Sequence, residues 1–267
     1  MQLKKPELDV GIMASDADAT CAFYRDVMGL REQPTLTVGK DLQQHRFAVG
    51  GHVLKVLRSG KPPEPEVSGI EKAIGMRLLA FILDDLDTVL ARLDAAGKRY
   101  STLPVPEKLG YRVAFTKDPE GTTLELVGLT KPGGDKLTAR LQVGLTVKDV
   151  ERSRHFYGQQ LGLPEQPVMK LAGTGTQVQE RFGFTWGTST VKLWHLGSEL
   201  PVHTGALTAH AGVRYFTAMV DDLDAAHKEL VAKDVPIRMP PRELPGLAKI
   251  MFIADPDDNW IEIAQRL

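Results

Sequence analysis

The segment Asp118-Pro119-Glu120-Gly121-Thr122-Thr123-Leu124-Glu125 decides the fold, because it returns near the end of the chain as Asp255-Pro256-Asp257-Asp258-Asn259-Trp260-Ile261-Glu262. In both copies Asp-Pro starts a turn, and Gly121 or the pair 258–259 accepts a backbone with positive φ. The alternating residues that follow are typical of a half-buried strand. Each copy therefore predicts a turn that leads into a strand ending on a carboxylate.

The spacing between these two segments recurs along the chain and identifies an internal duplication. The same interval of 137 positions separates Glu125 from Glu262, Lys55 from Lys192, Asp85 from Asp222 and Pro104 from Pro241. Earlier in each half the interval is 133, as between Tyr24 and Tyr157, so four residues are inserted in the second half between about 163 and 190. A repeat of this length predicts two copies of one structural unit.

Length and composition limit the classes of function. The chain has 267 residues, enough for two domains, and its 33 basic and 34 acidic residues give no electrostatic case for nucleic acid or an anionic membrane as partner. It lacks a signal-peptide core and an apolar run long enough to cross a bilayer, so a cytoplasmic location is expected. The single cysteine, Cys21, excludes an intrachain disulfide. The expected partner is a small-molecule ligand, and the expected assembly is a monomer or a homodimer.

The pattern of apolar residues predicts an α+β fold made of four βαβββ modules. In the first module a strand over 8–14 leads to a helix capped by Ser15 or Asp16, and strands near 34–38, 43–49 and 52–57 follow. The order repeats, which gives modules at about 8–60, 75–130, 138–197 and 211–265. Two domains, residues 1–130 and 138–267, are expected on either side of a linker at 131–137.

Several motifs of these modules together indicate a known family. They are Asp16 with Phe23-Tyr24 and Met28-Gly29-Leu30, their copies Asp149, Phe156-Tyr157 and Leu161-Gly162-Leu163, the helix starts at 84–87 and 221–224, and the two Asp-Pro turns. In this combination the chain resembles the vicinal oxygen chelate superfamily, which includes glyoxalase I, bleomycin-resistance proteins and extradiol dioxygenases. The resemblance implies paired modules that form half-open barrels of mixed sheet around a pocket. With four modules in one chain, each domain is expected to close its own barrel, and pairing across the halves is the alternative.

The resemblance also selects the positions from which metal ligands project inward in that superfamily. The first domain has Asp9, Lys55, Leu78 and Glu125 there, and the second has Gln142, Lys192, Tyr215 and Glu262. Exchanging modules between halves gives Asp9, Lys55, Tyr215 and Glu262, or Gln142, Lys192, Leu78 and Glu125. Every combination contains a lysine and lacks a histidine, and a protonated ammonium repels a dication and offers it no lone pair. Neither a metal site nor a cofactor is therefore expected.

Each lysine is expected to meet a glutamate inside a barrel, and this pair has two interpretations. In one, a buried Lys–Glu pair only neutralises the carboxylate where the superfamily places an ion. In the other, burial and mutual charge tune the pair for acid–base chemistry or for holding an anionic ligand. The catalytic candidates are Lys192, Tyr215, Glu262, Lys55, Glu125 and Asp9. Tyr215 favours the second domain as the functional one, because a phenol donates to a developing oxyanion.

Other residues are candidates for contacts with the ligand. They are Gln142, Arg112, Lys249, Trp186 and Leu78. Aromatic side chains near basic ones suit an aromatic or carboxylated ligand, but the same residues also suit the packing of a seam between domains.

The sequence leaves three functions open. The favoured one is a metal-independent lyase or isomerase acting on a small oxygenated molecule, including aromatic and carboxylated ones. The second is a non-catalytic protein that binds a small molecule, as in the resistance branch of the superfamily. The third, a metal-dependent glyoxalase or dioxygenase, is disfavoured by the lysines at the ligand positions.

Overall fold

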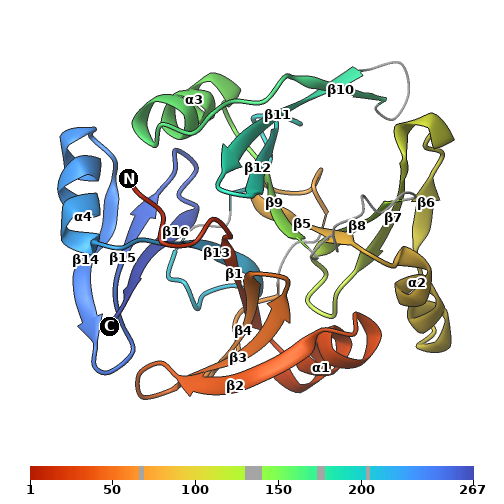
Figure 1. The fold of residues 1–267 in the computed structure, drawn as a ribbon, viewed down its shortest axis with the longest axis horizontal. Helices are drawn as coiled ribbons and strands as arrows, with labels where there is room; N and C mark the ends of the chain where they lie inside the picture. Colours follow the sequence, from red (N-terminus) through yellow and green to blue (C-terminus); the bar gives the residue numbers. More distant parts are fainter. Residues whose placement is uncertain (66–68, 130–139, 173–177, 203–204) are drawn as a thin grey trace.

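Sixteen strands form two curled sheets of eight strands each in the computed structural model, which describes all residues except 66–68, 130–139, 173–177 and 203–204. Four short α-helices lie around the sheets (Figure 1). The expected linker at 131–137 falls outside the described residues. None of the helices in the described parts of the chain is both long and apolar enough to cross a lipid bilayer.

The four expected βαβββ modules are confirmed. The first contains β1 (Asp9–Ala14), α1 (Ala17–Ala22), β2 (Arg31–Thr37), β3 (Leu42–Val49) and β4 (His52–Ser59). The second contains β5 (Gly75–Leu83), α2 (Leu86–Ala95), β6 (Ser101–Leu103), β7 (Tyr111–Lys117) and β8 (Thr123–Leu129). The third contains β9 (Arg140–Thr146), α3 (Val150–Arg154), β10 (Met169–Ala172), β11 (Val178–Trp186) and β12 (Ser189–Trp194). The fourth contains β13 (Gly212–Met219), α4 (Leu223–Ala232), β14 (Ile237–Leu244), β15 (Ala248–Ala254) and β16 (Trp260–Arg266).

The helices begin where the sequence predicts. Each of the four is preceded by an aspartate whose side chain accepts the backbone N–H three residues later, which satisfies one of the free donors at the helix start. These caps are Asp16, Asp85, Asp149 and Asp222. In the first and third modules the helix continues as a π-helical turn, Phe23–Val27 and His155–Gln160.

The sheets join modules from different halves, so the expectation that each half closes its own barrel is wrong. The first sheet has the order β14-β15-β16-β13-β1-β4-β3-β2 and contains the first and fourth modules. The second has the order β10-β11-β12-β9-β5-β8-β7-β6 and contains the third and second modules. Strand β1 runs antiparallel to β13, and β5 runs antiparallel to β9. The repeat makes β5 and β13 equivalent partners for β1, which is why periodicity does not choose between the two pairings.

The modules of one half are linked instead through the motifs that carry the repeat. The Tyr24 hydroxyl donates to Asp118 in the Asp-Pro turn of the second module at 2.8 Å, and Tyr157 donates to Asp255 in that of the fourth at 3.0 Å. All four side chains are buried. Glu120, from the first of these turns, accepts hydrogen bonds from residues at the start of α1. Each half is thus joined by turns and helices, whereas each sheet is joined across halves.

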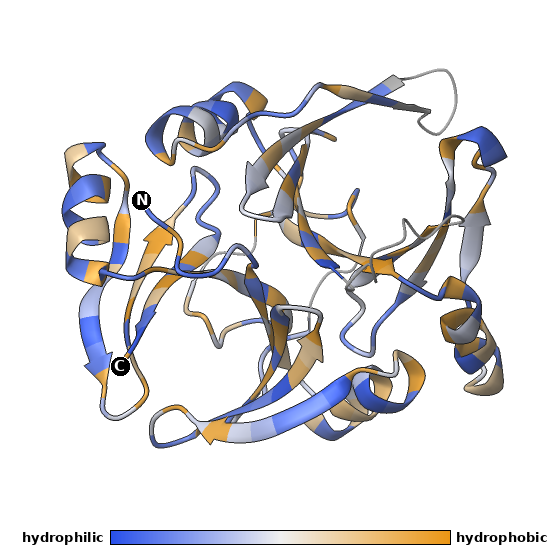
Figure 2. Cartoon of the chain, viewed as in Figure 1, coloured by the Kyte–Doolittle hydropathy of each residue, from blue (hydrophilic) through white to orange (hydrophobic). Residues whose placement is uncertain are grey.

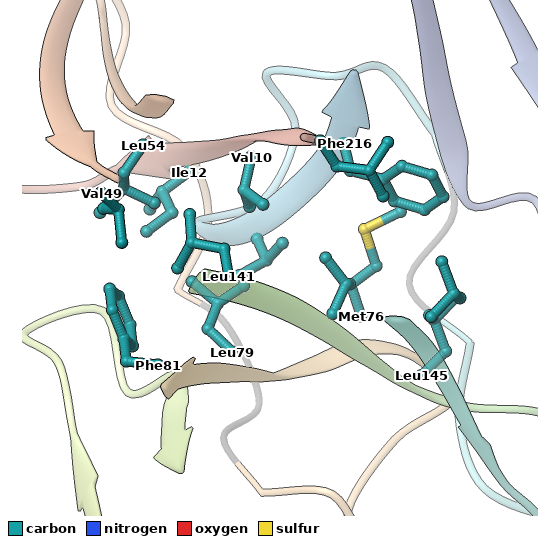
Figure 3. Close-up of a cluster of buried hydrophobic side chains, with 14 of the residues drawn as sticks. Val10, Ile12, Val49, Leu54, Met76, Leu79, Phe81, Leu141, Leu145 and Phe216 are labelled. Carbon is teal, nitrogen blue, oxygen red and sulfur yellow. The ribbon is translucent and has the colours of Figure 1, made fainter. Parts of the chain in front are cut away.

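The main core lies between the two sheets, where β1 and β13 face β5 and β9 (Figure 3). Val10, Ile12 and Phe216 from the first sheet pack there with Leu79 and Leu141 from the second. Hydrophobic residues are concentrated on these central strands, and the outer strands β2 and β14 are more hydrophilic (Figure 2). Because side chains alternate along a strand, the neighbours of these core residues project into the concave interior of each sheet.

Candidate functional site

The interior of the first sheet holds a buried cluster of Lys55, Thr217 and Glu262. The Lys55 ammonium donates to Glu262 Oε2 at 2.9 Å and to the Thr217 hydroxyl at 2.7 Å. The Thr217 hydroxyl donates to the same Glu262 oxygen at 2.5 Å. Thr217 and Glu262 lie side by side on the parallel strands β13 and β16, and Lys55 reaches them from β4 across β1. The glutamate is therefore fixed through one oxygen by a cation and a hydroxyl.

Gly11 allows the lysine and a tyrosine to come together above β1. Its register partners are Lys55 on one side and Tyr215 on the other. A Cβ atom at Gly11 would lie 2.0 Å from the Tyr215 ring, so only glycine lets the ring cover this position. The Lys55 ammonium lies 5.2 Å from the centre of that ring, within the range of a cation–π contact. Burial raises the pKa of the Tyr215 hydroxyl, which therefore stays protonated.

Asp9 is present in the same interior but is held by other groups. Its Oδ1 atom accepts from the Lys5 ammonium at 2.5 Å and from the Val53 backbone N–H at 2.8 Å. The side chain is almost fully buried. Asp9 therefore adds a fixed negative charge near Lys55.

The charges around Lys55 keep it protonated. Burial lowers the pKa of this ammonium, but the Glu262 carboxylate, with Asp9 as a second negative charge, outweighs burial, and the net result is a raised pKa. A lysine in this state acts as a fixed cation and hydrogen-bond donor rather than as a nucleophile or base.

The cluster opens onto a cavity of about 790 Å³. Lys55, Glu262 and Asp9 line it, and its apolar walls include Leu36, Val38, Leu244 and Ile250. The volume is within the range of sites for small molecules, which are about 300–1,000 Å³. Both hydrogen bonds to Glu262 among the described residues end on Oε2, so Oε1 is left for a ligand. Lys55 uses two of its three N–H donors on Thr217 and Glu262.

The second sheet repeats the ion pair in different surroundings. Lys192 donates to Glu125 Oε2 at 2.5 Å. Leu78, Ala80 and Trp194 form a buried apolar cluster in the same interior. Burial lowers the pKa of Lys192; the nearby Glu125 opposes this effect, Arg181 adds to it, and the net shift is downward. In this sheet an alanine stands where the first sheet has the bridging Thr217.

The four residues expected to form the pocket of the second half are divided between the two sheets. Tyr215 and Glu262 lie in the first sheet, and Lys192 and Gln142 lie in the second. The observed combinations are those given by exchanging modules between halves. The prediction of a pocket built from the second half alone is therefore wrong, because the glutamate and the lysine of that half face different interiors.

Three of the expected ligand contacts lie away from both interiors. Arg112 donates to Asp87 at 2.8 Å on the surface, and Lys249 pairs in the same way with Asp224. These duplicated pairs attach β7 to α2 and β15 to α4, and neither side chain lines the cavity described above. Trp186 is buried and packs edge-on against Phe216 with ring centres 5.4 Å apart, which makes it part of the seam between the two sheets.

Thr217 is the site residue that sequence reasoning missed. The signal was available, because Thr217 lies two positions after Tyr215 and alternation places both on one face of β13. The register confirms this placement by aligning Thr217 with Glu262. Arg46 also lines the cavity and was also missed, because the register of β3 with β4 decides which way its side chain points.

Comparisons with known proteins agree with this architecture. A family model described as the Glyoxalase/Bleomycin resistance protein/Dioxygenase superfamily matches residues 8–126 and 140–263. The chain belongs to this superfamily. The uncharacterized protein YaeR of Escherichia coli (strain K12) is 32% identical over 118 residues, 44% of this chain and 91% of that protein. A putative lactoylglutathione lyase of Brassica oleracea var. gemmifera is 23% identical over 97% of this chain and 91% of its own.

A solved structure shows the same fold over nearly the whole chain. Glyoxalase I from Zea mays superposes with a TM-score of 0.73 at 19% identity, covering 96% of this chain and 91% of the maize chain. At this identity the likeness establishes the fold, and the chemistry depends on the residues in the interior.

The interior residues of the first sheet do not fit the divalent metal of the superfamily. Lys55 places an ammonium among the four positions, and Asp9 already accepts two hydrogen bonds through one oxygen. Within the described ranges, no group of three or more His, Cys, Asp or Glu side chains is arranged to hold a metal ion. A site of this kind repels a dication and supplies too few oxygen or nitrogen ligands for one.

Proposed function

We propose that this protein is a metal-independent lyase or isomerase that acts on a small oxygenated, carboxylated molecule in the cavity of the first sheet. The observation that carries this proposal is the pair of Lys55 and Glu262 on the cavity wall, held from behind by the buried Thr217, with one glutamate oxygen and one lysine N–H left over. The superfamily membership of the chain and the relative named as a putative lactoylglutathione lyase support chemistry of this type.

In the proposed reaction Glu262 is the general base. Its Oε1 atom removes a proton from a carbon next to a carbonyl group of the substrate, while Thr217 and Lys55 hold Oε2 in place. The electron pair of the broken C–H bond moves to the carbonyl oxygen, and the Lys55 ammonium stabilises the resulting oxyanion. Return of the proton to a different carbon completes an isomerisation. Expulsion of a leaving group from the next carbon completes an elimination.

Tyr215 is a positioning residue in this scheme. Its side chain is buried and its ring covers Gly11, but it does not line the cavity. Its ring limits where the Lys55 ammonium can lie, and through that contact it orients the donor toward the oxyanion.

The test is deuterium exchange at carbon, followed by NMR. A panel of 2-oxo acids, 2-hydroxy acids and dicarbonyl compounds is incubated with the protein in D₂O with excess EDTA. We expect exchange or conversion of at least one compound by the wild type and its loss in Glu262→Gln and in the double variant Lys55→Met/Glu262→Leu. The matched control is Lys192→Met/Glu125→Leu, which removes the other pair and should retain the activity.

Two results would overturn the proposal. Activity that requires an added divalent ion and disappears with EDTA would restore the metal-dependent alternative. Saturable binding of a compound with neither exchange nor conversion would favour the alternative of a non-catalytic binding or resistance protein.

A further inference from the structure

The cavity of the first sheet contains two positive side chains side by side in its wall. Arg46 on β3 is the direct register partner of Lys55 on β4, so the two side chains project from the same face. Like charges directly opposite in an antiparallel pair are destabilising. Because both side chains line the cavity, a negatively charged group placed there would remove this repulsion.

The cavity carries more positive charge than its own acids neutralise. Five cationic side chains line it against two carboxylates. The cations are Lys4, Lys5, Arg46, Lys55 and Arg266, and the acids are Asp9 and Glu262. Asp9 is paired with Lys5, and Glu262 is paired with Lys55. In the part of the chain that the structure describes, neither Arg46 nor Arg266 forms a side-chain hydrogen bond or ion pair with the protein.

We infer that Arg46 and Arg266 form an anion-binding subsite that holds a carboxylate or phosphate group of the ligand. This inference rests on the proposed function and specifies its substrate class. A guanidinium presents a planar fork of N–H donors that matches both anions, and an ion pair of this geometry is stronger than a neutral hydrogen bond. Burial lowers the pKa of Arg46 and the nearby Arg266 lowers it further, which agrees with two guanidinium groups that share one region of the cavity.

The second sheet lacks this subsite. The residue opposite Lys192 is Gly183, and a Cβ atom there would lie 2.5 Å from the side-chain oxygen of Gln166. The counterpart of Arg266 in the repeat is Leu129. The space that the Arg46 side chain takes in the first sheet is thus taken by the neutral amide of Gln166 in the second sheet.

The geometry fixes how the ligand is oriented. Its anionic group lies at Arg46, and its reacting carbon lies at Glu262 Oε1. Arg46 lies beside Lys55, the Lys55 ammonium contacts Glu262 at 2.9 Å, and all three residues line one cavity, so one small molecule can reach both ends of this row. The apolar walls at Leu36, Leu244 and Ile250 suit a hydrocarbon or aromatic portion of that molecule.

The test uses isothermal titration calorimetry at low ionic strength with succinate, inorganic phosphate and the neutral analogue succinamide. We expect the wild type to bind at least one of the two anions and to bind succinamide much more weakly. Arg46→Gln should weaken anion binding about tenfold or more, and Arg266→Gln should weaken it several-fold. Arg25→Gln, which changes an exposed arginine of the first module, is the control and should bind as the wild type does. Tighter binding of succinate or of phosphate identifies the group that the subsite prefers.

Several outcomes would overturn the inference. They are no binding of either anion, equal binding of succinate and succinamide, and full anion affinity in Arg46→Gln. The outcome is separate from that of the proposed function. Anion binding that depends on Arg46, without deuterium exchange, would support the anion subsite and contradict the proposed reaction. Deuterium exchange without such anion binding would support the reaction and contradict the subsite.

Discussion

The two Lys–Glu pairs occupy equivalent positions in the repeat, yet their surroundings give them opposite properties. Lys55 and Glu262 face a large cavity, and the pKa of Lys55 is raised. Lys192 and Glu125 lie beside a buried apolar cluster, and the pKa of Lys192 is lowered. Burial opposes the charge on both lysines, so the difference comes from the other groups around them. The comparison shows that an ion pair alone does not define a functional site.

Three differences between the interiors account for the contrast. Where the first sheet has Asp9, Thr217 and Tyr215, the second has Gln142, Ala80 and Leu78. The first set supplies a negative charge, a bridging hydroxyl and an aromatic face, all of which favour a protonated lysine. The second set supplies none of these, and Arg181 adds a positive charge near Lys192. We therefore propose that the first pair is functional and that the second is structural.

The largest expected effect is a difference in the free energy of unfolding between variants of the two glutamates. Glu125→Gln leaves Lys192 buried without an acid beside it, and breaking a buried pair in this way costs about 3 kcal/mol. Glu262→Gln should cost clearly less, because Lys55 keeps Thr217, the negative charge of Asp9 and access to water in the cavity. The free energy of unfolding in urea measures both.

The double variants Lys192→Met/Glu125→Leu and Lys55→Met/Glu262→Leu are the controls for stability. Replacing both members of a buried pair by apolar residues is often neutral, so each should unfold close to the wild type. An equal loss of stability in the two single variants would contradict the structural distinction between the pairs.

A smaller effect is expected from adding a methyl group at the glycine beneath each interior. In Gly11→Ala the new Cβ meets the Tyr215 ring, and in Gly144→Ala it meets Trp194 at 2.5 Å. Both should lose about 2 kcal/mol through overpacking. Only Gly11→Ala should also weaken ligand binding, because displacement of Tyr215 moves Lys55. Calorimetry with succinate measures this, and an equal loss of binding in Gly144→Ala would show that the second interior contributes to the site.

Much of this comparison could be predicted from the sequence, and the remainder depends on spatial pairing. The intervals of 137 and 133 residues and the apolar pattern predicted the modules, and the resemblance to the superfamily implied the inward positions and a lysine beside each glutamate. They did not predict that Lys55 pairs with Glu262 instead of Glu125, because β5 and β13 are copies of one edge and either could accept β1. Arg112 and Lys249 occupy equivalent positions of the repeat and were predicted to contact the ligand. Each forms a surface ion pair, and a duplication repeats surface ion pairs as readily as site residues.

The smallest expected effect compares the two buried Tyr–Asp contacts that link the modules of each half. Burial raises the pKa of Asp118 to about 7 and that of Asp255 to about 6, and a free aspartate titrates near 3.9. Between about pH 4 and each folded-state pKa, the folded protein holds a proton that the unfolded chain has released, so stability is greatest at the acidic end and falls as the pH rises.

This fall should be reduced by Asp118→Asn and by Asp255→Asn, since asparagine carries no charge at either end of the pH range. Each substitution should remove part of the pH dependence, and Asp118→Asn should remove the larger part, because the pKa of Asp118 is raised further. Urea unfolding at pH 4.5 and pH 8 measures it. Tyr24→Phe and Tyr157→Phe complete the comparison, because losing a hydrogen bond to the ionised carboxylate should make the fall steeper. A steeper fall in the asparagine variants, or a larger effect in the second half than in the first, would contradict the assignment of this pH dependence to the two turns.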